Sequence, residues 1–435
     1  MKKKVSFISL GCFKNVVDTE VLGGLLEQRG MEIVSGYEKS DYLIINTCGF
    51  VRDAKEESIE EILTALEEKE KGDYKKIVAF GCLIERYYKD LKENFKNIDL
   101  LWGNNNLEKL ADLISKDENE DYSYNKLFLY DHNYKRITIT TPNSRFIKIS
   151  EGCNMKCSFC AIPQIRGEYR SRDIDSILIE AENLIKSGVK EITLISQNST
   201  YFGKDKGKES QLPELLKRLS ELGVEWIRVL YLMPEEVNDE ILDGFNNKNV
   251  LPYFDLPFQH VSKKIIKLMN RNGDFNDKLN LVKKIRKNFK NAVIRSSFIV
   301  GFPQEDDDDF ELLKEFVKES KIERIGVFGY SNEENTKAFE LEGQIDPYLI
   351  EMRKEELMDL SDKNIIKYNK KIREKEFEFL PLGSWENNNT IGRIWSQAPE
   401  VDGFTIINSR PDKDNNIIKI KVYGYDNEVL FGEKL

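Results

Sequence analysis

Apolar runs of strand length alternate with helical patterns in the first part of the chain. Four runs rich in Val, Ile and Phe lie at residues 5–12, 42–48, 76–82 and 98–103. A charged helical pattern fills residues 53–71, and another follows residue 82. Strands that alternate with helices are typical of βαβ units with a parallel sheet. Residues 1–118 are therefore expected to form a Rossmann-like α/β domain.

The same alternation resumes after a polar, acidic stretch at residues 116–143, the best candidate for a linker. Six further apolar runs lie at residues 146–149, 191–195, 226–231, 253–256, 292–300 and 324–328. Six strand–helix units fall short of the eight in a complete (β/α) barrel. Residues 140–372, including a long charged helix at 347–373, are expected to form an open, partial (β/α)6 barrel. Its site should lie at the carboxyl ends of the strands.

The pattern changes after residue 373. Short alternating strands lie at residues 376–379, 391–394, 404–407 and 417–423, with turns between them. This pattern predicts a small antiparallel β-barrel over residues 373–435. From residue 371 onward the chain has nine basic and eleven acidic side chains. A barrel that binds RNA is more often clearly basic.

Composition supports several domains in one globular protein. The chain has 435 residues, too many for one ordinary core, with 40% hydrophobic and 33% charged residues. No stretch approaches the roughly 18 apolar residues of a membrane helix, and no small-residue cleavage site follows the basic start. The net charge of −10 favours a protein substrate, particularly a basic one, over a nucleic acid. We expect a cytoplasmic monomer that does not bind a membrane.

The most informative chemistry lies in an eight-residue loop after the first barrel strand. It holds Cys153, Cys157 and Cys160. Thiolates select iron–sulfur clusters, zinc or copper(I), and a [4Fe–4S] cluster normally takes four of them. Three local thiolates, with Phe159 before the last, predict a radical S-adenosylmethionine (SAM) loop in which one iron stays free to bind SAM. The alternative is a zinc site completed by a distant His132 or His260, although neither lies in a ligand motif.

The other three cysteines each end one of the apolar runs of the first part. They are Cys12, Cys48 and Cys82. Because parallel strands end at the same edge of their sheet, these thiols are expected to come together there. They could hold a second three-thiolate cluster; the alternative is three buried, inert cysteines. With all six cysteines in metal triads, none remains for disulfides, which suits a reducing compartment.

The chain resembles the methylthiotransferase family over nearly its whole length, and within it the RimO-type branch. The similar stretches are residues 9–20, 46–50, 81–82, 151–163, 170–172, 257–260 and 298–303. The resemblance implies an amino-terminal three-cysteine domain, a central radical SAM barrel and a carboxyl-terminal TRAM barrel. Residues 14–15, 194–198 and 398–403 favour the branch that modifies a ribosomal protein.

This resemblance also implies an activity. The RimO-type branch methylthiolates the β-carbon of an aspartate in small-subunit ribosomal protein twelve, after a SAM-derived radical has abstracted a hydrogen. It implies a [4Fe–4S] cluster on each triad, SAM, and a reductant of the flavodoxin or ferredoxin type. One alternative is a transfer-RNA adenosine methylthiotransferase. Another is a non-catalytic RNA- or ribosome-binding module with structural metal.

Four residues are expected to contact SAM. They are Phe159, Gln197, Arg295 and Gly301, which lie in the cysteine loop or near strand ends. Gly301 would permit a close approach of the backbone. The acidic run at residues 305–309 looks like a calcium site, but it more readily opens a helix. His260 fits either the core or the cavity.

Overall fold

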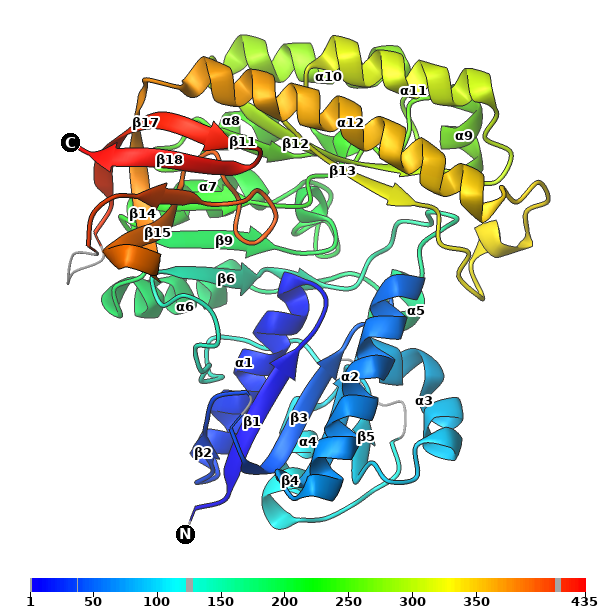
Figure 1. Cartoon of the computed structure of the whole chain (residues 1–435), viewed down its shortest axis with the longest axis vertical. Coiled ribbons are helices and arrows are strands. Elements are labelled where there is room, and N and C mark those ends of the chain that lie inside the picture. Colours follow the sequence, from blue (N-terminus) through cyan, green and yellow to red (C-terminus); the bar gives the residue numbers. More distant parts are fainter. Residues whose placement is uncertain (1, 37, 123–127, 411–415) are drawn as a thin grey trace.

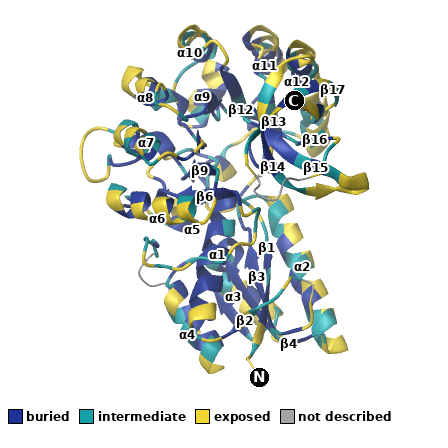
Figure 2. Ribbon diagram, turned by 90° about the vertical axis from the view of Figure 1, so that its left-hand side faces the viewer, coloured by how far each residue is buried: buried dark blue, intermediate teal, exposed yellow. Residues whose placement is uncertain are grey.

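The computed structural model describes residues 2–36, 38–122, 128–410 and 416–435. Figure 1 shows the amino-terminal part, in blue, below the larger central part in green and yellow. A small barrel, in red and dark orange, lies against one side of the central part. Buried residues run through the middle of all three parts, and exposed residues lie mainly on the outer helices (Figure 2).

The amino-terminal part is a five-stranded parallel sheet with the strand order β2-β1-β3-β4-β5. Its strands are β1 (Lys4–Ser9), β2 (Glu32–Ile33), β3 (Ser40–Thr47), β4 (Tyr74–Gly81) and β5 (Leu100–Trp102). Its helices are α1 (Phe13–Gln28), α2 (Arg52–Lys71), α3 (Cys82–Asn94) and α4 (Leu107–Lys116). The central strand β3 is almost entirely buried, as expected where helices cover both faces of a parallel sheet.

The central part contains the six predicted barrel strands in two parallel sheets. The strands are β6 (Ser144–Lys148), β9 (Glu191–Ile195), β10 (Trp226–Val229), β11 (Tyr253–Asp255), β12 (Val293–Val300) and β13 (Arg324–Gly329). The sheets have the orders β10-β9-β6 and β11-β12-β13, and a bridge between Ile227 and Val250 connects them. The six strands therefore form the predicted open, partial barrel, which confirms the fold class.

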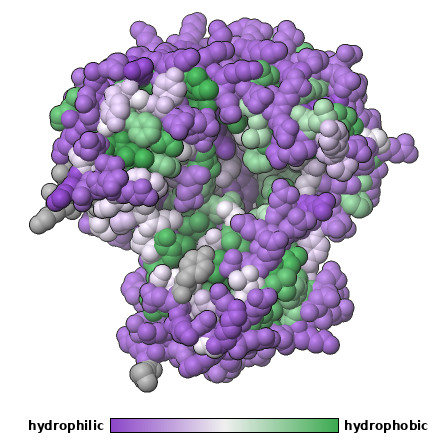
Figure 3. Space-filling view, in the orientation of Figure 1, coloured by the Kyte–Doolittle hydropathy of each residue, from purple (hydrophilic) through white to green (hydrophobic). Residues whose placement is uncertain are grey.

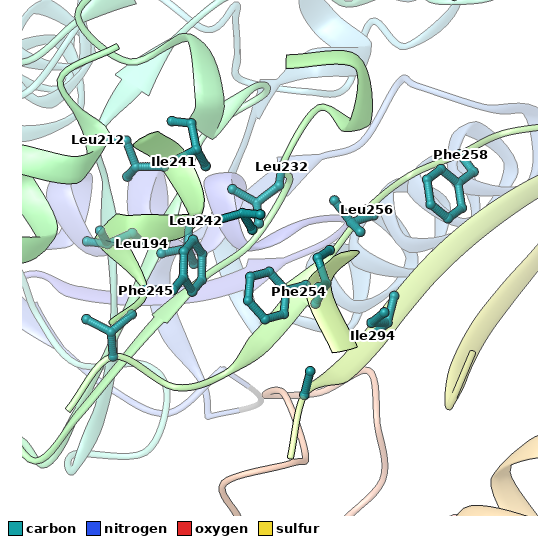
Figure 4. Packing of buried hydrophobic residues seen from close by; sticks show 14 of the residues in the cluster. Leu194, Leu212, Leu232, Ile241, Leu242, Phe245, Phe254, Leu256, Phe258 and Ile294 are labelled. Carbon is teal, nitrogen blue, oxygen red and sulfur yellow. The ribbon is translucent and has the colours of Figure 1, made fainter. Parts of the chain in front are cut away.

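Helices cover the outer face of this partial barrel. They are α6 (Ile174–Lys186), α7 (Leu212–Glu221), α8 (Asp239–Gly244), α9 (Lys263–Leu268), α10 (Phe275–Asn288), α11 (Asp307–Ser320) and α12 (Pro347–Ile372). Figure 4 shows Phe254, Leu256 and Ile294 among the fully buried side chains that pack between strands and helices. Short elements line the rim: α5 (Ile162–Arg166), β7 (Ser150–Glu151), β8 (Arg170–Ser171) and η3 (Lys337–Glu340).

The acidic run at 305–309 opens helix α11. Asp306 is the N-cap residue, and its side chain accepts a hydrogen bond from the backbone N–H of Asp309, 3.0 Å away. The Asp309 side chain accepts from the backbone N–H of Asp306 in return, which completes a capping box. The preceding Glu305 is buried and pairs with Arg353 at 2.9 Å. His260 is also fully buried, with its Nε2 atom 3.4 Å from Glu305, so it belongs to the core.

The carboxyl-terminal part is a closed barrel with the strand order β14-β15-β16-β18-β17. The strands are β14 (Glu376–Trp385), β15 (Asn389–Ile394), β16 (Thr405–Ile407), β17 (Ile418–Asp426) and β18 (Val429–Lys434). Two details differ from the sequence prediction. The fifth strand, β18, follows β17 after a tight turn in which Asn427 has a φ of 49°, and the sequence reading missed it. In addition, β16 pairs with β18 in parallel, so the barrel is not entirely antiparallel.

This small barrel closes the amino-terminal end of the partial barrel. Arg393 of β15 reaches the buried Glu191 at the start of β9. Asp402 accepts hydrogen bonds from Tyr253, at 2.5 Å, and through its backbone oxygen from Arg324, at 3.0 Å. Because these contacts occupy the amino ends of the strands, the carboxyl ends remain available for chemistry.

The stretch expected to be a linker is attached to the first domain where the structure describes it. The Ile137 backbone N–H donates to the Glu20 carbonyl at 3.0 Å, and Arg136 pairs with the Glu20 side chain. The segment around Lys135 packs directly on helix α1 at Gly24, because a Cβ at Gly24 would lie 1.9 Å from the Lys135 carbonyl oxygen. No helix in the described part of the chain is long and apolar enough to cross a membrane.

Candidate active site

The cysteines of the first part lie together at the carboxyl edge of its sheet. Cys12 is the N-cap residue of α1, Cys48 directly follows β3, and Cys82 begins α3 directly after β4. The turn before Cys12 packs on Cys48, since a Cβ at Gly11 would lie 2.7 Å from the Cys48 Cβ. Gly11 also has a φ of 85°, a conformation that favours glycine. This glycine therefore allows Cys12 to approach Cys48.

The second set of cysteines lies in a loop that backbone hydrogen bonds hold on both sides. The Cys153 N–H donates to the Gly167 carbonyl at 3.1 Å, and the Cys160 N–H donates to the Cys157 carbonyl at 3.2 Å. Ser158 N–H donates to the Met269 carbonyl at 3.0 Å, just beyond α9. Phe159 packs against a buried cluster that includes Met269 and Phe302. The loop is thus fixed against the carboxyl ends of the barrel strands.

Helix α5 brings the two triads into one region. It begins two residues after Cys160, and its Ile165, with Ala161, packs against Cys82 of the other triad. The strands of the amino-terminal sheet and of the partial barrel direct their carboxyl ends toward this region. It lies at the waist of the molecule, between the amino-terminal and central parts (Figure 1). Apolar side chains are visible around this waist in the space-filling view (Figure 3). Two groups of thiols distant in sequence are therefore neighbours in the fold.

Burial controls the ionisation of the thiols. It raises the pKa of Cys48 to about 12, with a further contribution from Cys82, and the pKa of Cys153 to about 11. Burial also raises the pKa of Cys160, and Cys157 adds to that rise. Because metal ligands must be thiolates, loading these sites has to release protons. Among the described residues, no group of three His, Cys, Asp or Glu side chains converges closely enough for a single metal ion.

A buried network of four charged side chains connects the two triads. Lys148 Nζ lies 2.5 Å from both the Asp18 and the Glu151 carboxylates. Arg166 pairs with Asp18 at 2.6 Å and with Glu151 at 3.3 Å. Burial alone would raise the pKa of Glu151, but Lys148 and Arg166 outweigh it and lower that pKa to about 2. Glu151 therefore stays ionised between the Lys148 ammonium and the Arg166 guanidinium.

Gln197, which the sequence predicts to contact SAM, lies beside this network just after β9. Its Nε2 donates to Glu151 Oε1 at 2.7 Å. Its buried Oε1 has no hydrogen-bond partner among the described residues. A buried polar atom without a partner is costly unless a ligand or water satisfies it. Gln197 therefore offers an acceptor that suits an amino group, such as that of SAM.

Arg295 and Gly301 lie elsewhere on β12 and just after it. Along β12, residues 295, 297 and 299 are half-buried while their neighbours are buried, so these alternate positions face the interior of the partial barrel. Arg295 pairs there with Asp255 at 3.1 Å and lies 3.7 Å from Asp402 of the small barrel. Gly301, with a φ of 73°, packs closely on α12, because a Cβ would lie 2.3 Å from Ile350. Neither residue contacts the cysteine loop in the contacts described here.

Two further side chains lie near the triads in positions that the sequence does not reveal. Lys14, two residues after Cys12, donates to the Ser196 carbonyl at 3.1 Å and lies 3.7 Å from the ring centre of Tyr231. It therefore joins the first triad to the barrel strands. Phe328 of β13 is 53% exposed and pairs in register with Ile299, which packs in the same buried cluster as Phe159. Phe328 is thus an exposed apolar ring on the edge strand of the partial barrel.

The partial barrel and the three-cysteine loop at its carboxyl end define a radical SAM enzyme. The chain matches the Radical SAM superfamily over residues 147–317. It also matches the uncharacterized protein family UPF0004 over residues 4–103 and the TRAM domain over residues 383–434. A solved radical SAM methyltransferase, TsrM from Kitasatospora setae, shares the fold. Its TM-score is 0.55 at 14% identity, over 76% of this chain and 75% of that one.

Curated relatives match almost the whole chain. The ribosomal protein uS12 methylthiotransferase RimO of Aquifex aeolicus is 43% identical over 96% of this chain and 94% of its own length. The protein of the same name from Acetivibrio thermocellus is 39% identical over 100% of this chain and 98% of its own. This chain therefore belongs to the RimO family of methylthiotransferases, which confirms the resemblance seen in the sequence.

Proposed function

We propose that this protein methylthiolates the β-carbon of an aspartate in ribosomal protein uS12. The observation that carries the proposal is the meeting of two cysteine triads on either side of α5, at the facing carboxyl edges of two parallel sheets. The names of its relatives support the same substrate and do not favour the alternative of a transfer-RNA adenosine. The non-catalytic alternative does not explain two open three-thiolate sites side by side.

We assign Cys153, Cys157 and Cys160 to one [4Fe–4S] cluster and Cys12, Cys48 and Cys82 to a second. The donor set suits this assignment, since three thiolates leave one iron of each cluster open. When bound, the first cluster with SAM supplies the hydrogen-abstracting radical, and the second supplies the sulfur. Zinc remains a poor alternative because neither histidine has a described contact with a cysteine. His260 lies in the core beside Glu305, and the backbone of His132 is hydrogen-bonded to Ser176 of α6.

The side chains around the triads then have distinct tasks. Gln197 would accept a hydrogen bond from SAM while Glu151 holds its amide group in place. Phe159 would pack on the adenine from its position in the cysteine loop. Arg295 and Gly301 would also contact SAM. Arg295 is held in the barrel interior by Asp255, whereas Gly301 lets the end of β12 approach Ile350 of helix α12. Phe328, on the open edge, would contact the incoming protein segment.

Several further properties belong to the same proposal. The division into domains at residues 1–118, 140–372 and 373–435 follows the three parts of the fold. A flavodoxin- or ferredoxin-type protein would supply electrons. Six free thiols suit a reducing compartment such as the cytoplasm. We retain a monomer as the expected state.

The test is a reaction in which the protein meets both candidate substrates. Anaerobically reconstituted protein is mixed with SAM, dithionite, and either small ribosomal subunits or bulk transfer RNA. Mass spectrometry should find a methylthio group on one aspartate of uS12 and none on adenosine. The Cys157→Ala variant is the matched control and should give no product. Modification of the RNA instead of uS12 would contradict the proposal.

A further inference from the structure

Arg166 is the side chain through which one cysteine loop reaches the other triad. It is the last residue of α5, six positions after Cys160, and its side chain is only 3% exposed. Its Nη2 atom lies 3.3 Å from Cys82 Sγ and 2.6 Å from Asn15 Oδ1. Cys82 Sγ also lies near the side-chain oxygens of Asn15 and Asn104, which accept from the thiol. Among the described hydrogen bonds, Arg166 is the donor to this sulfur.

The two ends of the guanidinium have separate partners. Nη1 faces the carboxylates of Asp18 and Glu151, whereas Nη2 faces Asn15 and the thiol of Cys82. A planar guanidinium can serve both directions at once, and a lysine ammonium cannot do so with the same geometry. Lys148 already helps to balance the two carboxylates. Nη2 has two N–H groups, so it can donate to Asn15 and to Cys82 at the same time.

A hydrogen bond to a ligating sulfur has a known physical effect. It stabilises negative charge on the sulfur and so favours the reduced form of an iron–sulfur cluster. Such bonds also orient the ligand, as outer contacts do at other metal sites. Arg166 ends the helix that follows the cysteine loop of the first triad, so its contact with Cys82 also fixes how the two sites lie relative to each other.

We propose that Arg166 is a positioning residue for the second cluster. It donates a hydrogen bond to the Cys82 thiolate, raises the reduction potential of that cluster, and ties it to the loop that carries the first. This inference rests on the proposed function, because it requires a cluster on Cys12, Cys48 and Cys82.

The experiment isolates the second site in the full-length chain. The parent protein carries Cys153→Ala, Cys157→Ala and Cys160→Ala, so only the second triad can hold iron. Arg166→Met removes the hydrogen-bond donors. Arg166→Lys keeps the positive charge but cannot donate to the carboxylates and to Cys82 at the same time. The control is Arg228→Met, which removes another fully buried arginine, paired with Glu191 at the opposite end of the barrel. Iron content and the midpoint potential are measured by chemical analysis and by EPR during a redox titration.

We expect Arg166→Met to shift the midpoint potential downward or to lose the iron, while Arg166→Lys shows a smaller shift and Arg228→Met shows none. An Arg166→Met protein that is folded, with unchanged iron and potential, overturns the proposal. If Arg166→Met does not fold, the test rests on Arg166→Lys. An unchanged midpoint potential in that variant would also overturn the proposal. A parent that binds no iron refutes the second cluster itself, and therefore the proposed function on which this inference depends.

Discussion

The two cysteine triads reach the same region by different routes. Cys153, Cys157 and Cys160 belong to one loop, whose backbone is fixed by Gly167 and Met269. Cys12, Cys48 and Cys82 come from the ends of three strands and meet only when the parallel sheet has formed. The local triad depends on one loop conformation, whereas the distributed triad depends on the packing of a whole domain. The chemistry of the second site is therefore linked to the stability of the fold.

The strongest test of this comparison removes each triad in turn. Replacing Cys153, Cys157 and Cys160 by alanine should abolish reductive cleavage of SAM and halve the iron, from about eight to about four atoms per chain if each triad holds a [4Fe–4S] cluster. Replacing Cys12, Cys48 and Cys82 should halve the iron too, but SAM cleavage should continue without methylthiolation of uS12. Iron analysis and chromatography of 5′-deoxyadenosine provide the measurements. Cleavage lost in both variants would contradict a division of labour.

The next test breaks the charge network between the triads. Lys148→Met should destabilise the protein by about 3–5 kcal/mol, because Asp18 and Glu151 would share only Arg166 in a buried environment. Urea denaturation followed by tryptophan fluorescence measures the loss. The matched control is Glu56→Ala, which removes an exposed pair with Arg52 and should leave the unfolding midpoint unchanged. Equal effects of the two variants would show that the network does not stabilise the contact between the amino-terminal and central parts.

A smaller effect should separate SAM binding from cluster binding. Gln197→Ala should weaken SAM binding by about 1 kcal/mol, or about fivefold in Kd, because it removes one buried acceptor. Iron content should not change, since Gln197 contacts Glu151 and no cysteine in the hydrogen bonds described. Equilibrium dialysis with labelled SAM provides the measurement, with the exposed Gln211→Ala as control. Unaltered SAM affinity would remove Gln197 from the site.

The smallest test concerns the acidic run, whose described ion pairs are with Lys264 and Arg353 and not with a cysteine. Asp306→Ala should lower stability by about 1 kcal/mol through the loss of an N-cap and should leave iron content and SAM cleavage unchanged. Thermal unfolding with and without added Ca²⁺ distinguishes the two interpretations of this run. A large calcium-dependent rise in the wild-type Tm, absent from the variant, would favour a cation site.

Sequence reasoning predicted the strands because their patterns are strong and local. The apolar runs before Cys12, Cys48 and Cys82 could be recognised one at a time, and the parallel sheet then implied that their ends meet. The strand β18 was missed because its apolar run, Val429 to Phe431, is followed at once by a glycine and two charged residues. A turn at Asn427 was a usable signal, since asparagine tolerates a positive φ.

The charged network could not be predicted in the same way. Asp18, Glu151 and Arg166 have ordinary sequence contexts, and charged residues are usually exposed. Lys148 did offer a signal, because it interrupts the apolar run of β6 and is fully buried in the structure. Its partners come from two domains, so only the three-dimensional arrangement identifies them. The same holds for Arg295, whose contact with Asp402 depends on the docking of the small barrel.

Helix α5 also limits how the length of this chain can change. One residue inserted between Cys160 and Arg166 would turn the end of the helix by about 100°, since an α-helix has about 3.6 residues per turn. The guanidinium would then leave the surface that faces Cys82, although every residue of the site would still be present. An insertion between Cys160 and Arg166 is therefore expected to disrupt the site, although loops between the outer helices could accept one. The number of residues in this segment fixes the distance between the two cysteine triads.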